Sequence, residues 1–144
     1  MKPTRRDLSL LLPALMAAAD ARAETTPLPS KCYEFTELPV KKNPETHNES
    51  RQVFNGVTHT GCPVDLHITT LAPGLMPHPP HHHVHEEAMF IKEGTLEFMI
   101  AGKTSRVGPG SVVYVNSNDE HGLKNVGEAP ATYFVLALGQ EKKA

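Results

Sequence analysis

From Arg51 onward the sequence is a series of short runs rich in β-branched and aromatic residues, and each run is closed by a turn signal. The signals are Asn55-Gly56, Ala72-Pro73-Gly74, Gly94, Gly102 and Gly108-Pro109-Gly110. No long stretch of apolar residues at helical spacing follows residue 23, and short runs punctuated in this way are typical of β-strands. The pattern predicts an all-β domain over residues 51–140, with about seven or eight strands in a sandwich or small barrel.

The size and charge of the chain narrow the range of functions. Its 144 residues are enough for one domain. The formal net charge is −2, and Lys and Arg are scattered along the sequence. Because a phosphate backbone is attracted by clustered positive charge, we expect no nucleic-acid partner.

The first 23 residues, MKPTRRDLSLLLPALMAAADARA, have the composition of an export signal. A basic start precedes an apolar run from Leu8 to Ala19, and the segment ends in Ala-Arg-Ala. The apolar run is shorter than the about 20 residues that span a bilayer, so we expect cleavage after Ala23 and no stable membrane anchor. The pair Arg5-Arg6 before the run resembles a twin-arginine signal, which implies a folded protein exported to the periplasm or secreted. An ordinary secretory signal is the alternative.

Residues 24–50 are rich in Pro, Lys, Glu and Asn, and we interpret them as an N-terminal arm with one strand-like run, CYEFTEL, at 32–38. The two cysteines of the chain are Cys32 in this arm and Cys62. In an oxidising compartment they could form a disulfide. Two free thiols explain the sequence equally well.

Metal-ligating side chains are concentrated at residues 77–87, PHPPHHHVHEE, which hold five of the nine histidines and two glutamates. On a strand, side chains two residues apart point to the same face. The residues that would share a face are His81, His83, His85 and Glu87. Imidazole nitrogen and carboxylate oxygen together suit a first-row metal ion. A further ligand should come from another segment, and His121, at the start of the run HGLKN, is the best candidate.

The spacing of these residues resembles the two signature motifs of the cupin superfamily. The first motif, G(X)5HXH(X)3–4E(X)6G, is matched by His81, His83, Glu87 and Gly94. The second, G(X)5PXG(X)2H(X)3N, is matched by Gly110, His121 and Asn125. Together the motifs cover residues 74–125, which is most of the predicted domain.

The match departs from the motifs at turn positions. Gly74 stands one residue too early in the first motif, and Asn116 and Asn118 replace the proline and the glycine of the second. The histidines are also crowded, so a one-residue bulge could exchange His82 or His85 for one of the named ligands.

The resemblance implies an all-β cupin jelly roll, a double-stranded β-helix barrel. It also implies a divalent first-row metal ion held by four residues, His81, His83, Glu87 and His121. A protein that folds before export can acquire its ion in the cytoplasm, so Mn or Fe is favoured, with Ni, Cu or Zn as alternatives. Glu87 could also be catalytic, as a proton acceptor. A metal-free barrel with a polar mouth is the alternative interpretation.

Function is less constrained than fold, because cupins share one scaffold across many activities. Three histidines and one glutamate leave coordination positions open for substrate or dioxygen. The resemblance to quercetinase-like cupins favours an oxidoreductase of the dioxygenase type acting on a small oxygen-rich or phenolic substrate. Alternatives are a metal-dependent isomerase or lyase and a non-catalytic metal or small-ligand binder. A homodimer is compatible with each of these.

Six further residues lie on predicted strands where they would either line the barrel or pack in its core. They are His67, Met89, Phe98, Met99, Tyr114 and Phe134.

Overall fold

The computed structural model describes residues 26–45 and 48–139, so the predicted export signal lies outside the described residues. In these described residues, one 3-10 helix and nine strands follow one another. Their bounds are η1 Phe35–Glu37, β1 Val40–Lys42, β2 Glu49–Val57, β3 Pro63–Leu71, β4 Glu86–Glu93, β5 Leu96–Ile100, β6 Lys103–Val107, β7 Val112–Val115, β8 His121–Asn125 and β9 Ala131–Leu138. Within residues 26–45 and 48–139, no helix has the length and apolar character needed to cross a membrane.

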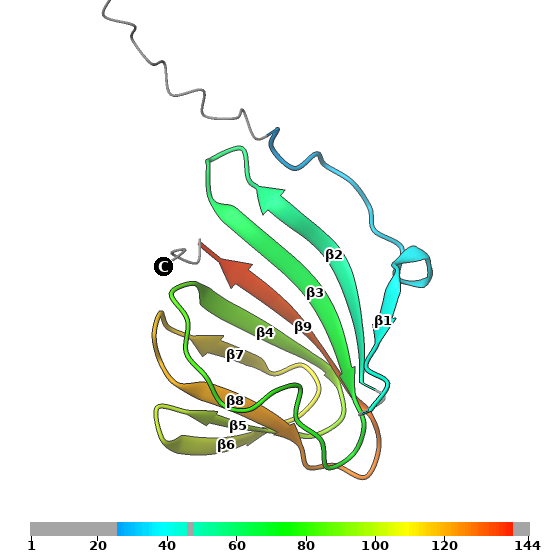
Figure 1. Cartoon of the computed structure of the whole chain (residues 1–144), viewed down its shortest axis with the longest axis vertical. Coiled ribbons are helices and arrows are strands. Elements are labelled where there is room, and N and C mark those ends of the chain that lie inside the picture. Colours follow the sequence, from blue (N-terminus) through cyan, green and yellow to red (C-terminus); the bar gives the residue numbers. More distant parts are fainter. Residues whose placement is uncertain (1–25, 46–47, 140–144) are drawn as a thin grey trace, which may run out of the picture.

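The strands form two antiparallel sheets, so the predicted all-β fold class is confirmed. The larger sheet has the order β1-β2-β3-β9-β4-β7 and the smaller one β6-β5-β8. Figure 1 shows the smaller sheet beside the β4 and β7 half of the larger one, while β1 and β2 extend away from it. Each sheet contains neighbours that are not consecutive in the chain, β3-β9, β9-β4 and β4-β7 in the larger one and β5-β8 in the smaller one, as in a jelly roll.

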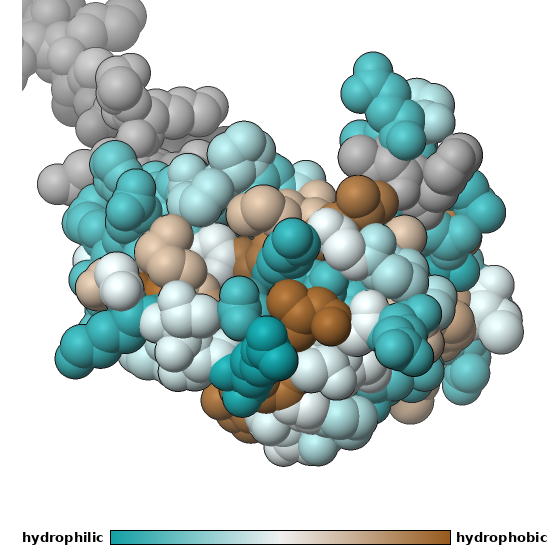
Figure 2. Space-filling model, turned by 90° about the horizontal axis from the view of Figure 1, so that it is seen from below, coloured by the Kyte–Doolittle hydropathy of each residue, from teal (hydrophilic) through white to brown (hydrophobic). Residues whose placement is uncertain are grey.

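The hydrophobic core lies between the two sheets, where alternate residues of each strand point inward. Its buried members are Leu71, Met89, Ile91, Leu96, Phe98, Val113, Val115, Leu123, Ala131, Tyr133 and Val135. On the face seen in Figure 2, hydrophobic side chains appear in separate small groups among hydrophilic ones. Scattered surface residues of this kind need no partner.

The predicted strand at residues 32–38 is wrong, because this segment contains η1 and no strand. Its aromatic side chains contact the larger sheet without joining its hydrogen bonds. The ring of Tyr33 lies 5.8 Å from that of Phe54, and the guanidinium of Arg51 lies 4.5 Å from the ring centre of Phe35. Alternating aromatic residues therefore anchor this segment through side chains, whereas the arm on either side of it bonds to β2 through its backbone, at Leu28 and along β1. Cys32 and Cys62 are both free thiols.

The predicted turn at Asn55-Gly56 is also wrong, because β2 continues through both residues to Val57. The turn comes later, where the amide of Thr58 donates to the carbonyl of Cys62 over 2.8 Å. Gly56 serves packing instead, since a Cβ there would lie 2.8 Å from the side chain of Leu28 in the arm.

Candidate metal centre

The candidate site is built from the segment before β4, the start of β4 and the start of β8. We predicted that residues 81–85 are strand, but β4 begins only at Glu86. Prolines at 77, 79 and 80 offer no N–H to a ladder. A single antiparallel bridge instead joins His81 to His121, with N–H to O distances of 3.0 and 2.8 Å.

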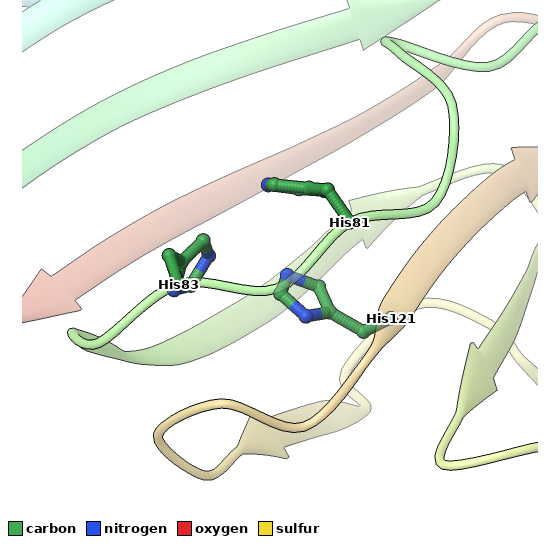
Figure 3. A group of neighbouring side chains, drawn as sticks. All are labelled: His81, His83 and His121. Atoms are coloured by element: carbon green, nitrogen blue, oxygen red, sulfur yellow. The ribbon is translucent and has the colours of Figure 1, made fainter.

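Three imidazole rings converge at this bridge, as Figure 3 shows. The ring centres of His81 and His83 are 5.1 Å apart, those of His81 and His121 4.8 Å, and those of His83 and His121 4.7 Å. One nitrogen from each ring lies within 4.8 Å of the others. Nitrogens at such separations could hold one ion, because metal–nitrogen bonds are about 2.0–2.1 Å long.

The carboxylate of Glu87 faces the same space from β4. Its Oε1 lies 3.4 Å from Nε2 of His83, and its Oε2 lies 3.5 Å from Nε2 of His121. The fold therefore brings the three predicted histidines together and places Glu87 beside two of them, while the group whose ligand atoms all lie within 4.8 Å contains the histidines without Glu87. Their role as ligands stays a prediction, which metal analysis can test.

The orientation of the rings is fixed by backbone carbonyls. Nδ1 of His83 lies 2.8 Å from the carbonyl oxygen of His85, and Nδ1 of His121 lies 2.8 Å from that of Asp119. A carbonyl oxygen can only accept, so each Nδ1 carries the hydrogen and each Nε2 presents a lone pair. Backbone partners of this kind commonly orient metal-binding histidines.

The lone pairs have no hydrogen-bond partner in the described structure. Nε2 of His83, Nε2 of His121 and Nδ1 of His81 are buried without one, although carboxylate oxygens lie near the first two. Buried polar atoms are nearly always satisfied, so three unsatisfied nitrogens around one point call for an explanation. The donor set fits a bound first-row metal ion, which would satisfy all three.

The environment of His81 favours its neutral form. Burial lowers the pKa of His81 below the usual 6.5, and the positive charges that His78, His121 and His83 can carry lower it further. Glu87 acts in the opposite direction, more weakly. The ring therefore keeps a lone pair for a metal ion at neutral pH.

Metal affinity is expected to stay constant from pH 8 to about 6.5 and to fall below about pH 6, because protons then compete for the imidazoles. Because the pKa of His81 is lowered, this ring should become protonated, and stop binding the metal, at a lower pH than an ordinary histidine. Titration of the apoprotein with metal against a competing chelator, at one-unit steps from pH 8 to 5, measures this. An affinity that is unchanged down to pH 5 would contradict histidine ligation.

His85 offers a second arrangement that shares His83. Its ring stacks on that of His83 with centres 3.5 Å apart, and its Nε2 lies 3.3 Å from Oε1 of Glu87. His83, His85 and Glu87 thus form a second group with ligand atoms within 4.8 Å. We favour the group with His81, whose nitrogen has no partner, because His85 already contacts Glu87. His82 is exposed and belongs to neither group of the described residues.

A cavity of about 470 Å³ opens on this site. Its lining includes Glu87, His121, Met89 and Tyr133 near the core, and Thr69 and His67 on β3. Burial raises the pKa of Tyr133 far above its usual value; a hydrogen bond with Thr69 opposes this and the charge of Glu87 adds to it. Tyr133 therefore keeps its proton and offers a hydrogen-bond donor in the cavity wall.

The predicted wall residues divide into four sets. His67 and Met89 line the cavity, Met99 lines a smaller pocket of about 160 Å³, and Phe98 packs in the core. Tyr114 and Phe134 were expected inside but belong to the outer face of the larger sheet. Tyr114 is 50% exposed between the buried Val113 and Val115.

Two further wall residues, Tyr133 and Gln52, are not predicted from the sequence. Tyr133 lies in the continuous apolar run of β9, which has no alternation to show which side chains face the cavity. Gln52 could be recognised as a wall residue only from its pairing with His67 on β3, which the sequence does not show.

An antiparallel jelly roll with histidines and a glutamate gathered at one cavity is the architecture of a cupin. Residues 67–137 match the family described as the cupin domain, Cupin_2. The cupin jelly roll predicted for this chain is thereby confirmed.

Curated relatives and solved structures extend this comparison. Over 65 residues, the chain is 42% identical to L-ectoine synthase from Bordetella parapertussis, covering 44% of this chain and 49% of that protein. The polyketide cyclase RemF from Streptomyces resistomycificus superposes with a TM-score of 0.66 at 19% identity, over 80% of this chain and 83% of RemF. A predicted oxalate decarboxylase from Thermotoga maritima gives a TM-score of 0.62 at 17% identity, over 76% and 100%.

The sequence match and the structural matches support different conclusions. The chain matches about half the length, 49%, of the ectoine synthases. The structural neighbours are less than 25% identical, so they establish the fold alone.

Proposed function

We propose that this protein is a metal-dependent enzyme that acts on a small oxygen-rich molecule. The observation that carries the proposal is the set of buried nitrogens without partners on His81, His83 and His121, beside the Glu87 carboxylate in the cavity wall. A merely structural ion would not need a cavity of about 470 Å³ beside it.

A bound ion would polarise an oxygen atom of the substrate. The chain's own residues then have separate tasks. Both oxygens of Glu87 face histidine nitrogens, which favours a ligand role over the role of proton acceptor. The protonated hydroxyl of Tyr133 can donate a hydrogen bond to a substrate oxygen.

We favour a reaction without net oxidation, such as cyclisation, elimination or isomerisation. Similar proteins include a synthase, a polyketide cyclase, a predicted decarboxylase and a sugar phosphate isomerase, and none of these names denotes an oxygenase. Dioxygenase chemistry is the second candidate, because the three histidine nitrogens, with the Glu87 carboxylate beside two of them, would leave coordination positions for dioxygen.

Metal analysis followed by turnover assays tests both candidates. We expect protein from the exported fraction of its host to carry Mn or Fe, as a protein exported in folded form would. We then expect turnover of small carbonyl, hydroxy-acid or phenolic compounds, measured by mass spectrometry with and without oxygen. Turnover without oxygen supports the first candidate, and oxygen uptake with polyphenols supports the second.

Three outcomes contradict parts of this proposal. Protein without any first-row metal would refute a metal-dependent enzyme. Copper or zinc at full occupancy would refute the choice of Mn or Fe. Tight retention of a ligand with no turnover would identify a binding protein instead.

A further inference from the structure

We propose that His67, oriented by Asp65, takes a proton from the molecule bound at the metal centre and returns one to it. The inference rests on the proposed function and adds a residue to it. The ligand class is a small molecule with oxygen atoms for the metal and an acidic C–H, O–H or N–H toward β3. Four observations support it.

The first observation is the pairing of His67 with a carboxylate. Nδ1 of His67 lies 3.2 Å from Oδ1 of Asp65, two residues earlier on β3. With the hydrogen on Nδ1, the lone pair of Nε2 is free to accept a proton. The side chain of His67 is 33% exposed and lines the cavity, so a bound molecule can reach it.

The second observation is the support of Asp65 itself. Its Oδ2 lies 3.0 Å from Nε2 of Gln52 and 2.6 Å from Nδ2 of Asn55, so two amide groups donate to one oxygen. Gln52 and Asn55 are three residues apart and would point to opposite faces of a regular strand. The pairing of β2 with β3 shifts between Gln52 and Phe54. This bulge puts both amides on the face of Asp65.

An ordinary solvated Asp–His pair would not need the two amide donors that hold Asp65. An exposed aspartate beside a histidine can satisfy its oxygens with water, and such pairs contribute little to stability. A bulge whose result is two donors on one carboxylate oxygen fixes that carboxylate in place. It thereby fixes the direction of the His67 ring.

The third observation is the place of His67 relative to the metal centre. On the larger sheet, Asp65 pairs with Ala137 and Ala137 with Glu87, so Asp65 and Glu87 lie in one row on the inner face. His67, Val135 and Met89 form the next row. β3 and β4 are therefore two strand spacings apart, roughly 10 Å. A small molecule at the metal centre fits into that span.

The fourth observation is that other groups around the cavity are unsuited to this task. Glu87 faces the histidines with both oxygens, and Tyr133 holds its proton firmly. The groups that face His67 are Asp65 on its own strand, Gln52 on β2 and the Glu87 and Tyr133 side of the cavity. His78 and His121 also line the cavity, but Nδ1 of His78 lies 3.1 Å from the carbonyl oxygen of Pro79 and Nε2 of His121 points to the proposed metal. Of the three rings, His67 is the one whose Nδ1 is oriented by a carboxylate.

The step can be written for a ligand with a C–H next to a carbonyl. The C–H bond breaks and its proton forms an N–H bond at Nε2 of His67. The electron pair of the C–H bond moves into the carbonyl and gives an enolate. Return of the proton to carbon restores the ligand, and in D₂O a deuteron returns instead.

Deuterium uptake by two probes, pyruvate and 2-oxoglutarate, measures this step. The protein is loaded with Zn²⁺, which has no redox chemistry, and metal content is checked for each variant. We expect uptake next to the carbonyl, measured by mass spectrometry, to fall about 100-fold in His67→Asn, since general bases contribute about 10²–10⁴-fold. The Asn amide can still donate to Asp65, so the fold should be retained; His67→Gln is the second variant.

Two further variants separate positioning from chemistry. Asp65→Asn should lower uptake by about tenfold. It should also mix the two tautomers of His67, as seen by ¹⁵N NMR of the imidazole. His59→Asn, at an exposed site outside the cavity, should change neither quantity.

The outcomes distinguish this inference from the proposed function. Equal uptake by wild type and both His67 variants with both probes, at full metal content, would overturn the role of His67 and leave the metal-dependent enzyme intact. Wild-type protein that binds no Zn²⁺ would refute the proposed function and this inference with it.

Discussion

Replacement of His83 or His121 by Ala is expected to remove the metal ion while the protein remains folded. Each change removes one of the four predicted ligands, and we expect affinity to fall by at least about 100-fold, since even loss of a residue behind a ligand costs about 10–100-fold. The fold should persist because both histidines lie outside the hydrophobic core cluster. Metal content by mass spectrometry and thermal unfolding by circular dichroism give the two readouts.

The matched control is His82→Ala, which removes an exposed histidine from the same segment and should keep the metal. His85→Ala should also keep it if the group containing His81 is the binding group. Loss of metal in His85→Ala together with retention in His81→Ala would assign the site to His83, His85 and Glu87 instead. Full metal occupancy in both His83→Ala and His121→Ala would show that neither group of side chains binds the metal.

The metal site is predicted from the spacing of histidines along one strand, but in the structure a different feature brings these histidines together. We placed His81 and His83 on one strand face, but they lie on an irregular segment held by the bridge to His121. Their convergence therefore depends on pairing with β8, about 40 residues away in the chain. The motif spacing therefore identifies the residues that come together, but it does not show that pairing with β8 brings them together.

The departures from the motifs show which property of a turn residue matters. Asn118, at the position of the motif glycine, has φ of 63°, and Gly74, one position early, has φ of 76°. Both take the left-handed conformation, which asparagine tolerates better than most residues. Asn118 therefore provides the left-handed conformation that a glycine at its position would provide, although the residue type differs.

The Asp65–His67 pair could not be predicted from the sequence. Asp and His two residues apart on a strand are common, and nothing in the sequence shows where β2 pairs with β3. The bulge between Gln52 and Phe54 brings the supporting amides to Asp65, and a bulge follows from tertiary packing. Local sequence patterns reflect neighbours along the chain, so they predict most of the strands. They do not reflect contacts between distant strands, so they do not predict this site.

Replacement of Asn125 by Ala is expected to destabilise the protein by about 3–5 kcal/mol, because buried groups left without partners cost about 1–3 kcal/mol each. Asn125 is fully buried. Its Nδ2 donates to the carbonyls of Leu71 and Ala129 over 3.0 and 2.9 Å, and its Oδ1 accepts from the amide of Gly127 over 3.0 Å. Thermal unfolding should show a midpoint about 10–17 °C lower.

This asparagine also holds the start of the histidine segment, since its backbone bonds to both residues of the Gly74-Leu75 turn, over 2.9 and 3.0 Å. Alanine keeps these two backbone bonds but loses the side-chain bond to the carbonyl of Leu71, three residues before the turn. The turn should therefore be held less firmly, and metal affinity of Asn125→Ala should fall even at temperatures where the protein is folded. Asn116→Ala is the matched control, because Asn116 is an exposed residue of the same motif and should change stability by less than about 0.5 kcal/mol. Equal unfolding midpoints for the two variants would contradict a structural role for Asn125. A lowered midpoint with unchanged metal affinity would show instead that the bridge between His81 and His121 holds the site without the turn behind it.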